Sequence, residues 1–233
     1  MDAVVMAAGE GRRLRPLTER WAKPVLPIDG VPILARLLRE LAAAGLPRVW
    51  LVTGHLGEQV RALAGDGEAF GLEVRDVRQP SVQGSADAVA RALEAEATVP
   101  LVVSAADTVF GPGDIALFAR TFASAGAAGA IAVRREPAPG EGRPAMSIRD
   151  GHIERMRSDS ASSSLSGAPL WALDEPVVER MRCDREPYEL GNSFQAAIDA
   201  GAMIAAIEIG KTRDLTDPLD LVEENFPYLG AWT

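Results

Sequence analysis

The chain has 233 residues, of which 47% are hydrophobic and 24% charged, a balance typical of a soluble globular enzyme with one α/β domain. Its net charge of −9 argues against a nucleic acid or an anionic membrane surface as partner. The single cysteine, Cys183, excludes an internal disulfide bond and a zinc site of several thiolates. No segment reaches the roughly 18 uncharged apolar residues of a membrane helix, and the N-terminus lacks the basic region of a signal peptide. We therefore expect a cytoplasmic protein.

Strand-like and helix-like segments alternate through the first half of the chain. The expected strands cover 3–6, 49–53, 72–77 and 101–104, and the expected helices cover 32–45, 56–63 and 84–95. This alternation predicts a mainly parallel, Rossmann-like sheet flanked by helices. Because ligands lie beyond the carboxyl ends of such strands, Gly9, Gln79 and Asp107 should share one crevice.

The second half has a different pattern. We expect strands at 128–133, 167–171 and 203–209, a hairpin over 147–157 about Asp150-Gly151, and helices at 177–181, 189–200 and 218–224. The serine-rich stretch 158–166 is a low-complexity loop. With no internal repeat or linker, the chain is predicted to be one α/β domain over 1–233, in which about 134–233 form a smaller α+β lobe.

Residues 6–24 form the most informative segment. Gly9 and Gly11 follow the first strand and leave backbone N–H groups accessible to a phosphate. Fixed positive charge follows at four positions: Arg12, Arg13, Arg15 and Lys23. A P-loop is excluded because no Gly-Lys-Ser/Thr follows, and a dinucleotide fingerprint because Leu14 replaces its third glycine. The segment suits a nucleoside triphosphate, and an arginine-rich turn is the alternative.

This segment resembles the signature of the sugar-phosphate nucleotidyltransferases, roughly Leu-Ala-Gly-Gly-x-Gly-Thr-Arg-Leu-x-Pro-Leu-Thr…Lys-Pro. Ala8 replaces the first loop glycine, and Arg12 stands where threonine is commonest. The resemblance implies a nucleotide-binding half over about 1–133, and an acceptor lobe with a C-terminal helix over about 134–233. It also implies that a group of loop residues holds the nucleotide: Ala7, Ala8, Gly9, Gly11 and Arg12.

The same resemblance recurs at 79–86, which is similar to the family's base-binding segment. Gln79 offers an amide donor and acceptor to a base edge, and Gly84 lets a planar ring lie against backbone. By this match Gln79, Gly84 and Ser85 contact the nucleotide. A surface turn followed by a helix is the alternative.

Two aspartates resemble the family's magnesium ligands. Asp107 lies just beyond a buried strand, and Asp214 belongs to a closing pattern similar to Asp-(Ile/Val)-x-Thr-Pro-Glu-Asp-Leu…Asn. Mg²⁺ requires only one or two carboxylates when substrate phosphates complete its shell. The alternative for Asp107 is a helix N-cap, although Asp114 is better placed to cap the following helix. Asp217, before Pro218, is predicted to cap the last helix.

Three residues are candidates for the acceptor side. Glu189 stands where relatives carry a glutamate that binds sugar hydroxyls, although the match is partial and Asn192 is an alternative cap for the next helix. Gly167 resembles the glycine whose backbone faces the sugar. Lys211, three residues before Asp214, is in reach of a phosphate or else solvated. The lysine that relatives often carry in the strand before the residue matching Gly167 is absent here, where the basic residues are Arg155 and Arg157.

The resemblance implies Mg²⁺-dependent transfer of a nucleoside monophosphate from a nucleoside triphosphate to a sugar 1-phosphate. The products would be a nucleoside-diphosphate sugar and pyrophosphate, and the catalytic residues would be Arg13, Lys23, Asp107 and Asp214. A cytidylyltransferase acting on choline, inositol or phosphonate acceptors is one alternative. A non-catalytic nucleotide-binding regulatory homologue is another, and the resemblance leaves open whether the chain forms a homo-oligomer.

Overall fold

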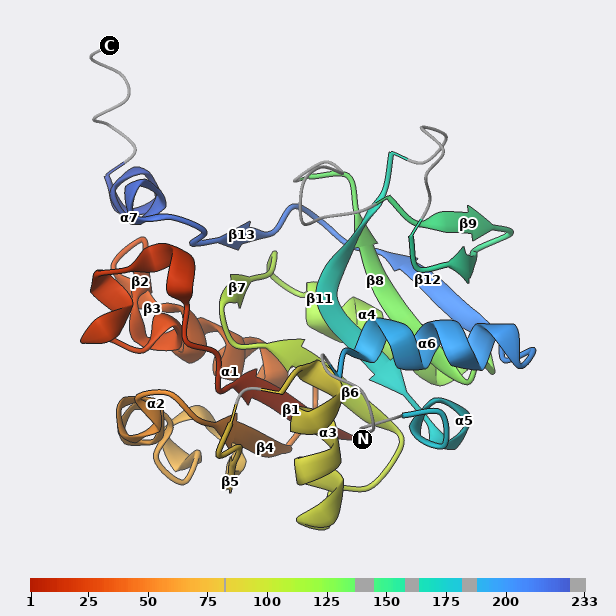
Figure 1. Ribbon diagram of the computed structural model, residues 1–233, viewed down its shortest axis with the longest axis horizontal. Coiled ribbons are helices and arrows are strands. Elements are labelled where there is room, and N and C mark those ends of the chain that lie inside the picture. The colour runs from red at the N-terminus through yellow and green to blue at the C-terminus, as the bar shows by residue number, and fades with distance from the viewer. Residues whose placement is uncertain (82, 137–144, 158–163, 182–187, 227–233) are drawn as a thin grey trace.

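A nine-stranded sheet runs through the molecule (Figure 1). The computed structural model describes residues 1–81, 83–136, 145–157, 164–181 and 188–226. The strand order is β5-β4-β1-β6-β11-β8-β12-β10-β9. The strands are β1 (Asp2–Ala7), β4 (Arg48–Thr53), β5 (Glu73–Arg78), β6 (Leu101–Ala105), β8 (Gly129–Arg134), β9 (Ser147–Arg149), β10 (His152–Arg155), β11 (Ser166–Leu173) and β12 (Ile204–Glu208).

Strands β5, β4, β1 and β6 form the continuous run of parallel strands that the alternating pattern predicted. β1 pairs in parallel with β4 and β6, and β4 pairs in parallel with β5. The strands of the second half continue the same sheet, because β11 pairs antiparallel with both β6 and β8. The expected smaller lobe is therefore an extension of the main sheet.

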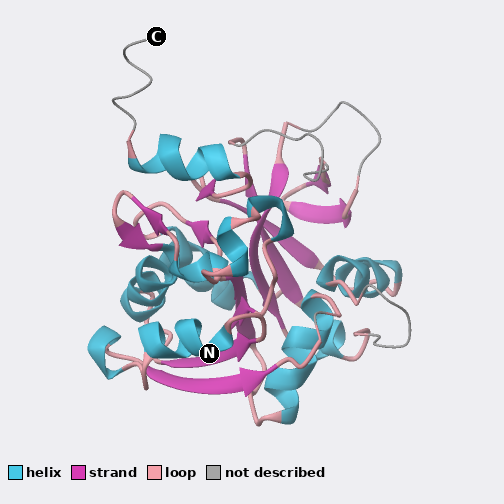
Figure 2. Cartoon of the chain, turned by 60° about the vertical axis from the view of Figure 1, so that its left-hand side comes forward, coloured by secondary structure: helices cyan, strands magenta, loops and turns pink. Residues whose placement is uncertain are grey.

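Helices cover both faces of the sheet (Figure 2). One face packs on α1 (Ile33–Ala43), α2 (Gly57–Ala64) and α4 (Asp114–Ala125), and the other on α3 (Ser85–Glu94), α5 (Glu175–Val178) and α6 (Leu190–Asp199). Along β1 the side chains alternate between the two cores, with Val5 in one and Val4 in the other. Because both faces are buried, the strand is apolar almost throughout. In the described part of the chain, none of the helices has the length and apolarity to span a bilayer.

Short elements surround the loop after β1. Three 3-10 turns, η1 (Arg12–Leu14), η2 (Leu17–Glu19) and η3 (Lys23–Val25), precede a hairpin of β2 (Pro27–Ile28) and β3 (Val31–Pro32). A second two-stranded sheet pairs β7 (Thr108–Val109) with β13 (Arg213–Asp214). The chain then enters α7 (Pro218–Asn225). A fourth 3-10 turn, η4 (Glu68–Phe70), lies before β5.

The predicted elements are present with small shifts at their ends, but two predicted caps differ from the structure. Asp217 does cap α7, accepting from the Leu219 and Asp220 N–H groups. Asp114 is instead the first helical residue of α4, and its carboxylate accepts from the N–H groups of Gly111 and Gly210. Asn192 lies within α6, not at its N-cap. Cys183 and residues 158–163 of the serine-rich stretch lie outside the described residues.

Candidate active site

Two adjoining cavities lie at the carboxyl ends of β1 and β6. The first, which we call the loop cavity, has a volume of about 640 Å³. Its lining brings together Gly9, Gln79 and Asp107, so the predicted shared crevice is confirmed. The second, which we call the adjoining cavity, has a volume of about 1160 Å³ and is lined by Asp214 and Gly167 among others. Five residues line both cavities: Arg13, Ser85, Asp107, Glu189 and Thr216.

The glycine loop packs closely on the protein at Gly11 and is open at Gly9. Gly11 has φ of +61°, and a Cβ there would lie 2.9 Å from the Thr18 Cγ2 atom. The Thr18 hydroxyl donates to the Gly11 carbonyl over 2.9 Å. Gly9 differs, because no heavy atom lies within 4 Å of the position of its missing Cβ. The space beside Gly9 therefore opens into the cavity, as an anion site built on backbone N–H groups requires.

The arginines of this loop differ in their partners. Arg12 is exposed, and its Nε atom donates to Glu10 over 2.8 Å. This hydrogen bond holds the pKa of the Glu10 carboxyl below its usual value. Arg13 forms no ion pair with any other residue that the structure describes, and it faces both cavities. Arg13 is therefore the loop cation whose charge is available to a ligand.

Lys23 and Asp107 form an ion pair where the cavities meet. The Lys23 Nζ atom lies 2.5 Å from the Asp107 Oδ2 atom. The Lys23 side chain is only 12% exposed, whereas that of Asp107 is 36% exposed. The largely covered lysine therefore supplies positive charge at a point where the carboxylate remains open to solvent and ligand.

Asp214 reaches the same region through the small sheet of β7 and β13. Asp214 lies opposite Thr108 in the ladder, next to Asp107 along the chain, and both carboxylates line the adjoining cavity. Among the residues described, no group of three or more histidine, cysteine, aspartate or glutamate side chains forms a metal cluster. Two carboxylates nevertheless fit Mg²⁺, which binds oxygen ligands and takes its remaining ones from water and substrate phosphates.

The Gln79 amide is fixed in one orientation. Its Nε2 atom donates to the Asp87 Oδ2 atom over 2.7 Å and to the Gly84 carbonyl over 3.2 Å. Because a carboxylate only accepts, this arrangement leaves the Gln79 Oε1 atom as the acceptor for a ligand. Asp87 is 5% exposed and was not identified from the sequence, although an acid in the first turn of the helix after Gly84 was the available signal.

Ser85 and Glu189 connect α3 with α6 at the boundary of the two cavities. The Ser85 hydroxyl donates to the Glu189 Oε2 atom over 2.5 Å and accepts from the Leu190 N–H over 2.8 Å. Gly167 lines the adjoining cavity, and a Cβ there would lie 2.5 Å from the Met146 Cε atom. The structure does not bring Lys211 to this site, because its 67% exposed side chain pairs with Glu136 at 3.6 Å and lines neither cavity.

The adjoining cavity also contains arginines. Arg134 at the end of β8 is buried, and its Nη1 atom donates to the Thr212 hydroxyl. Arg155 and Arg157 are exposed on and after β10, and neither forms an ion pair with another described residue. This half of the site therefore combines the Glu189 carboxylate with several guanidinium groups, a mixture suited to an anionic, hydroxylated ligand.

Comparisons with known proteins identify relatives of this chain and a solved structure with the same fold. A glucose-1-phosphate thymidylyltransferase of Streptomyces griseus is 28% identical over 97% of this chain, and the chain spans 65% of that relative's length. A CMP-5'-(3-aminopropyl)phosphonate synthase of Streptomyces rubellomurinus is 50% identical over 34% of this chain and 12% of its own. The structure of the inositol-1-phosphate CTP transferase from T. maritima superposes with a TM-score of 0.79, at 18% identity, over 94% of this chain and 90% of that one.

The family comparison covers more than half of the chain. The model of the nucleotidyl transferase family matches residues 2–143, which contain the glycine loop, Lys23, Gln79 and Asp107. The chain therefore belongs to the nucleotidyl transferase family.

Proposed function

We propose that this protein is a Mg²⁺-dependent nucleotidyltransferase that transfers a nucleoside monophosphate from a nucleoside triphosphate to a sugar 1-phosphate. The observation that carries the proposal is the Lys23–Asp107 pair at the junction of the two cavities, with Arg13 and Asp214 beside it. The loop cavity would take the triphosphate and the adjoining cavity the acceptor. The relative from Streptomyces griseus supports this assignment, because it is named as a glucose-1-phosphate thymidylyltransferase.

In the proposed reaction an oxygen of the acceptor phosphate attacks the α-phosphorus in line, forming a new P–O bond. The bond from the α-phosphorus to the bridging oxygen breaks, and pyrophosphate leaves with the electron pair. Such a transfer requires positioning and charge neutralisation more than covalent chemistry from the protein. Mg²⁺, held by Asp107 and Asp214, would supply positive charge to the reacting phosphates.

The protein groups have separate tasks in this mechanism. Arg13 and the N–H groups of 9–12 would bind the β- and γ-phosphates, which become the leaving group. Lys23 would neutralise charge on the α-phosphate or the incoming phosphate. The Gln79 Oε1 atom would accept a hydrogen bond from the nucleobase, and Glu189 would accept from acceptor hydroxyls.

A second candidate is cytidylyl transfer to a phosphonate or another non-sugar phosphate. The phosphonate synthase relative supports it, with 50% identity over 78 residues, against 28% identity over 232 residues for the thymidylyltransferase. A non-catalytic nucleotide-binding role has less support, because all four candidate catalytic residues are present. Arg13 and Asp107 line both cavities, and Lys23 is paired with Asp107.

The test is a pyrophosphate-release screen of the nucleoside triphosphates against phosphorylated acceptors, with and without Mg²⁺. We expect Mg²⁺-dependent release with a sugar 1-phosphate. Release only with a phosphonate or another non-sugar acceptor would select the second candidate, and no release with any pair would overturn both. Asp107→Asn, an isosteric change at a partly exposed carboxylate, should lower turnover at least about tenfold with an unchanged circular dichroism spectrum.

A further inference from the structure

The candidate ligand Asp214 stands on an unusually small element. β13 has two residues, and among the residues that the structure describes it pairs only with the two residues of β7, outside the nine-stranded sheet. A ladder of this length contributes few hydrogen bonds, so it constrains the separation of Asp214 from Asp107 only weakly. Some other contact must hold β13 in register.

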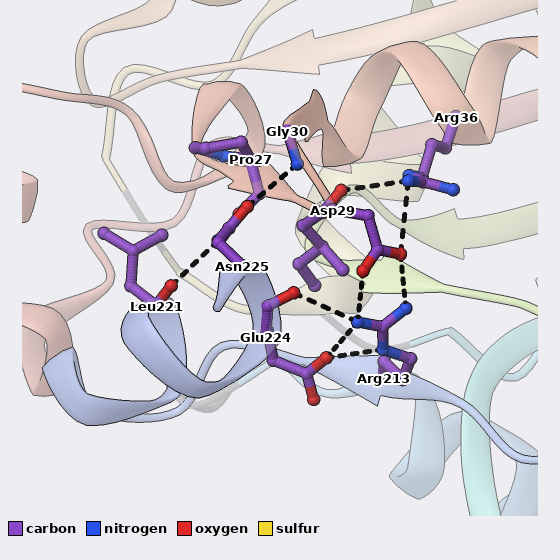
Figure 3. Close-up of polar contacts among 9 residues, drawn as sticks. Pro27, Asp29, Gly30, Arg36, Arg213, Leu221, Glu224 and Asn225 are labelled. Carbon is purple, nitrogen blue, oxygen red and sulfur yellow. Dashed lines mark hydrogen bonds and ion pairs between the residues drawn. The ribbon is translucent and has the colours of Figure 1, made fainter. Parts of the chain in front are cut away.

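The side chain of Arg213 provides that contact. Its Nη1 and Nη2 atoms donate to the two carboxylate oxygens of Asp29 over 2.6 and 3.0 Å, and its Nε atom donates to the Glu224 Oε2 atom over 2.5 Å (Figure 3). Successive side chains of a strand point to opposite sides, so Asp214 faces the adjoining cavity while Arg213 points away from it. A paired, planar contact of this kind restricts direction as well as distance.

The end of α7 completes the connection. The Asn225 Nδ2 atom donates to the Pro27 carbonyl over 2.8 Å, and its Oδ1 atom accepts from the Gly30 N–H over 2.9 Å (Figure 3). The Asp29 N–H donates to the Glu224 carbonyl over 3.3 Å. We call this set, Arg213, Asp29, Glu224 and Asn225, the C-terminal latch.

The latch joins the two sides of the candidate catalytic centre. Asp29 lies in the turn of the β2–β3 hairpin, which follows η3, the turn that carries Lys23. Arg213 immediately precedes Asp214, and Leu215 on its other side is fully buried in a small core with Ile28. Asp214 is thus anchored through both of its chain neighbours to the segment that follows Lys23.

We propose that Arg213 is a positioning residue that holds Asp214 at the distance from Asp107 needed for a divalent cation. The latch thereby sets the affinity of the site for the metal; this inference rests on the proposed function. The Arg213 and Asp29 side chains are 31% and 45% exposed, so their ion pair contributes only modestly to stability, and we infer that the bidentate contact acts chiefly on the position of β13. Loss of a group that hydrogen-bonds a metal ligand directly typically weakens metal binding by about 10–100-fold, and Arg213, which acts through the backbone next to Asp214, should lie near the lower end of that range.

The experiment compares Arg213→Met with Arg36→Met. Arg36 donates to the same Asp29 carboxylate over 3.3 Å and to the Ile28 carbonyl over 3.0 Å, but within the described chain it forms no hydrogen bond or ion pair with β13. Binding of Mn²⁺ to the free protein is measured by electron paramagnetic resonance, and the Mg²⁺ concentration for half-maximal pyrophosphate release is measured in parallel. We expect Arg213→Met to weaken Mn²⁺ binding about tenfold or more and to raise the Mg²⁺ requirement equally, with kcat restored at saturating Mg²⁺. Arg36→Met should match the wild type, and Arg213→Lys should be intermediate, because lysine lacks the planar fork.

With an active wild type, two results would overturn the role proposed for Arg213. One is a lower unfolding temperature in Arg213→Met with unchanged Mn²⁺ affinity. The other is that Arg36→Met weakens Mn²⁺ binding as much as Arg213→Met does. If Arg213→Met does not fold, Asp29→Asn tests the same contact with little change in volume, and unchanged Mn²⁺ affinity there also overturns the proposal. A wild type that neither releases pyrophosphate nor binds Mn²⁺ overturns the proposed function and, with it, the latch.

Discussion

Lys23→Met is the sharpest test of the candidate centre. The substitution removes the ammonium that lies 2.5 Å from Asp107 and keeps an unbranched side chain of similar length. The wild-type lysine is 12% exposed, so methionine fills the same largely buried space. The change therefore removes charge with little effect on packing.

The expected losses of activity and stability differ in size. Removing one preorganised donor from a developing charge typically lowers kcat by about 10²–10³, or about 2.7–4 kcal/mol. The stability term is smaller, because Asp107 is 36% exposed and water can solvate it once the lysine is gone. It should lie near the ~0.2–1 kcal/mol of exposed pairs and well below the ~3–5 kcal/mol of buried ones. For a chain of this length, 1 kcal/mol corresponds to a shift of about 2–4 °C in the unfolding temperature.

The assay measures initial rates of pyrophosphate release at saturating substrates, together with thermal unfolding by circular dichroism. Arg20→Met is the matched control, because it removes an exposed cation from the same loop region at a position that lines neither cavity. We expect the control to keep wild-type activity within about twofold. A twofold or smaller loss of kcat in Lys23→Met would refute the role given to this lysine. If Lys23→Met lost activity because it unfolded, the prediction of a large loss of kcat with only a small loss of stability would be refuted.

Three further predictions follow from local geometry. Gly84→Ala should lower the unfolding temperature and abolish nucleotide binding, because Gly84 has φ of +125° and an added Cβ would lie 2.3 Å from the Tyr188 carbonyl oxygen. Gly9→Ala should keep the wild-type unfolding temperature and weaken only triphosphate binding, measured by calorimetry, because the space beside Gly9 is open. Equal destabilisation by the two substitutions would contradict this prediction. Asp87→Asn should reduce discrimination among nucleoside triphosphates, measured as ratios of kcat/KM. Asparagine can either accept or donate, so it no longer fixes the orientation of the Gln79 amide. Unchanged ratios would show that Asp87 does not orient the Gln79 amide. The hydrogen bond from Arg213 lowers the pKa of Asp29, which also pairs with Arg36 and shares Arg213 with the Glu224 carboxylate. The stabilisation of the fold by ionised Asp29 should therefore be complete above the ordinary aspartate pKa near 4 and disappear as the pH falls through the lower folded value. In urea unfolding, the stability of Asp29→Asn should converge with that of the wild type in acid, and a constant difference down to pH 2 would refute this.

Much of the fold was predictable because its signals are local. The apolar run of β1 and the alternation of strands with amphipathic helices identified the parallel half of the sheet. The two-residue strands β7 and β13 were missed, since two residues carry no periodicity. Asp114 was misassigned as a cap because its carboxylate accepts from Gly210, a partner 96 residues away that local pattern cannot reveal.

The candidate site divides in the same way. Gly9, Gln79 and Asp107 were expected in one crevice from the strand pattern, and Glu189 was expected from the family resemblance alone. The structure brings all four to the loop cavity. Lys211 shows the limit of this reasoning, because its distance along the chain from Asp214 is short while its side chain turns to Glu136. Asp87 and Arg213 escaped notice because they act on other protein side chains and carry no ligand-binding motif of their own.

By itself, the sequence determined the chemistry available to this protein: a glycine loop followed by fixed positive charge, an amide and a few well-spaced carboxylates. These follow from residue types and from neighbours within a few positions. Only the tertiary structure decided which of them meet. Lys23 contacts Asp107 across 84 residues, and Arg213 contacts Asp29 across 184. Such contacts depend on the path of the whole chain through the sheet, because charges that are distant in sequence interact strongly only where the fold brings them within a few ångströms.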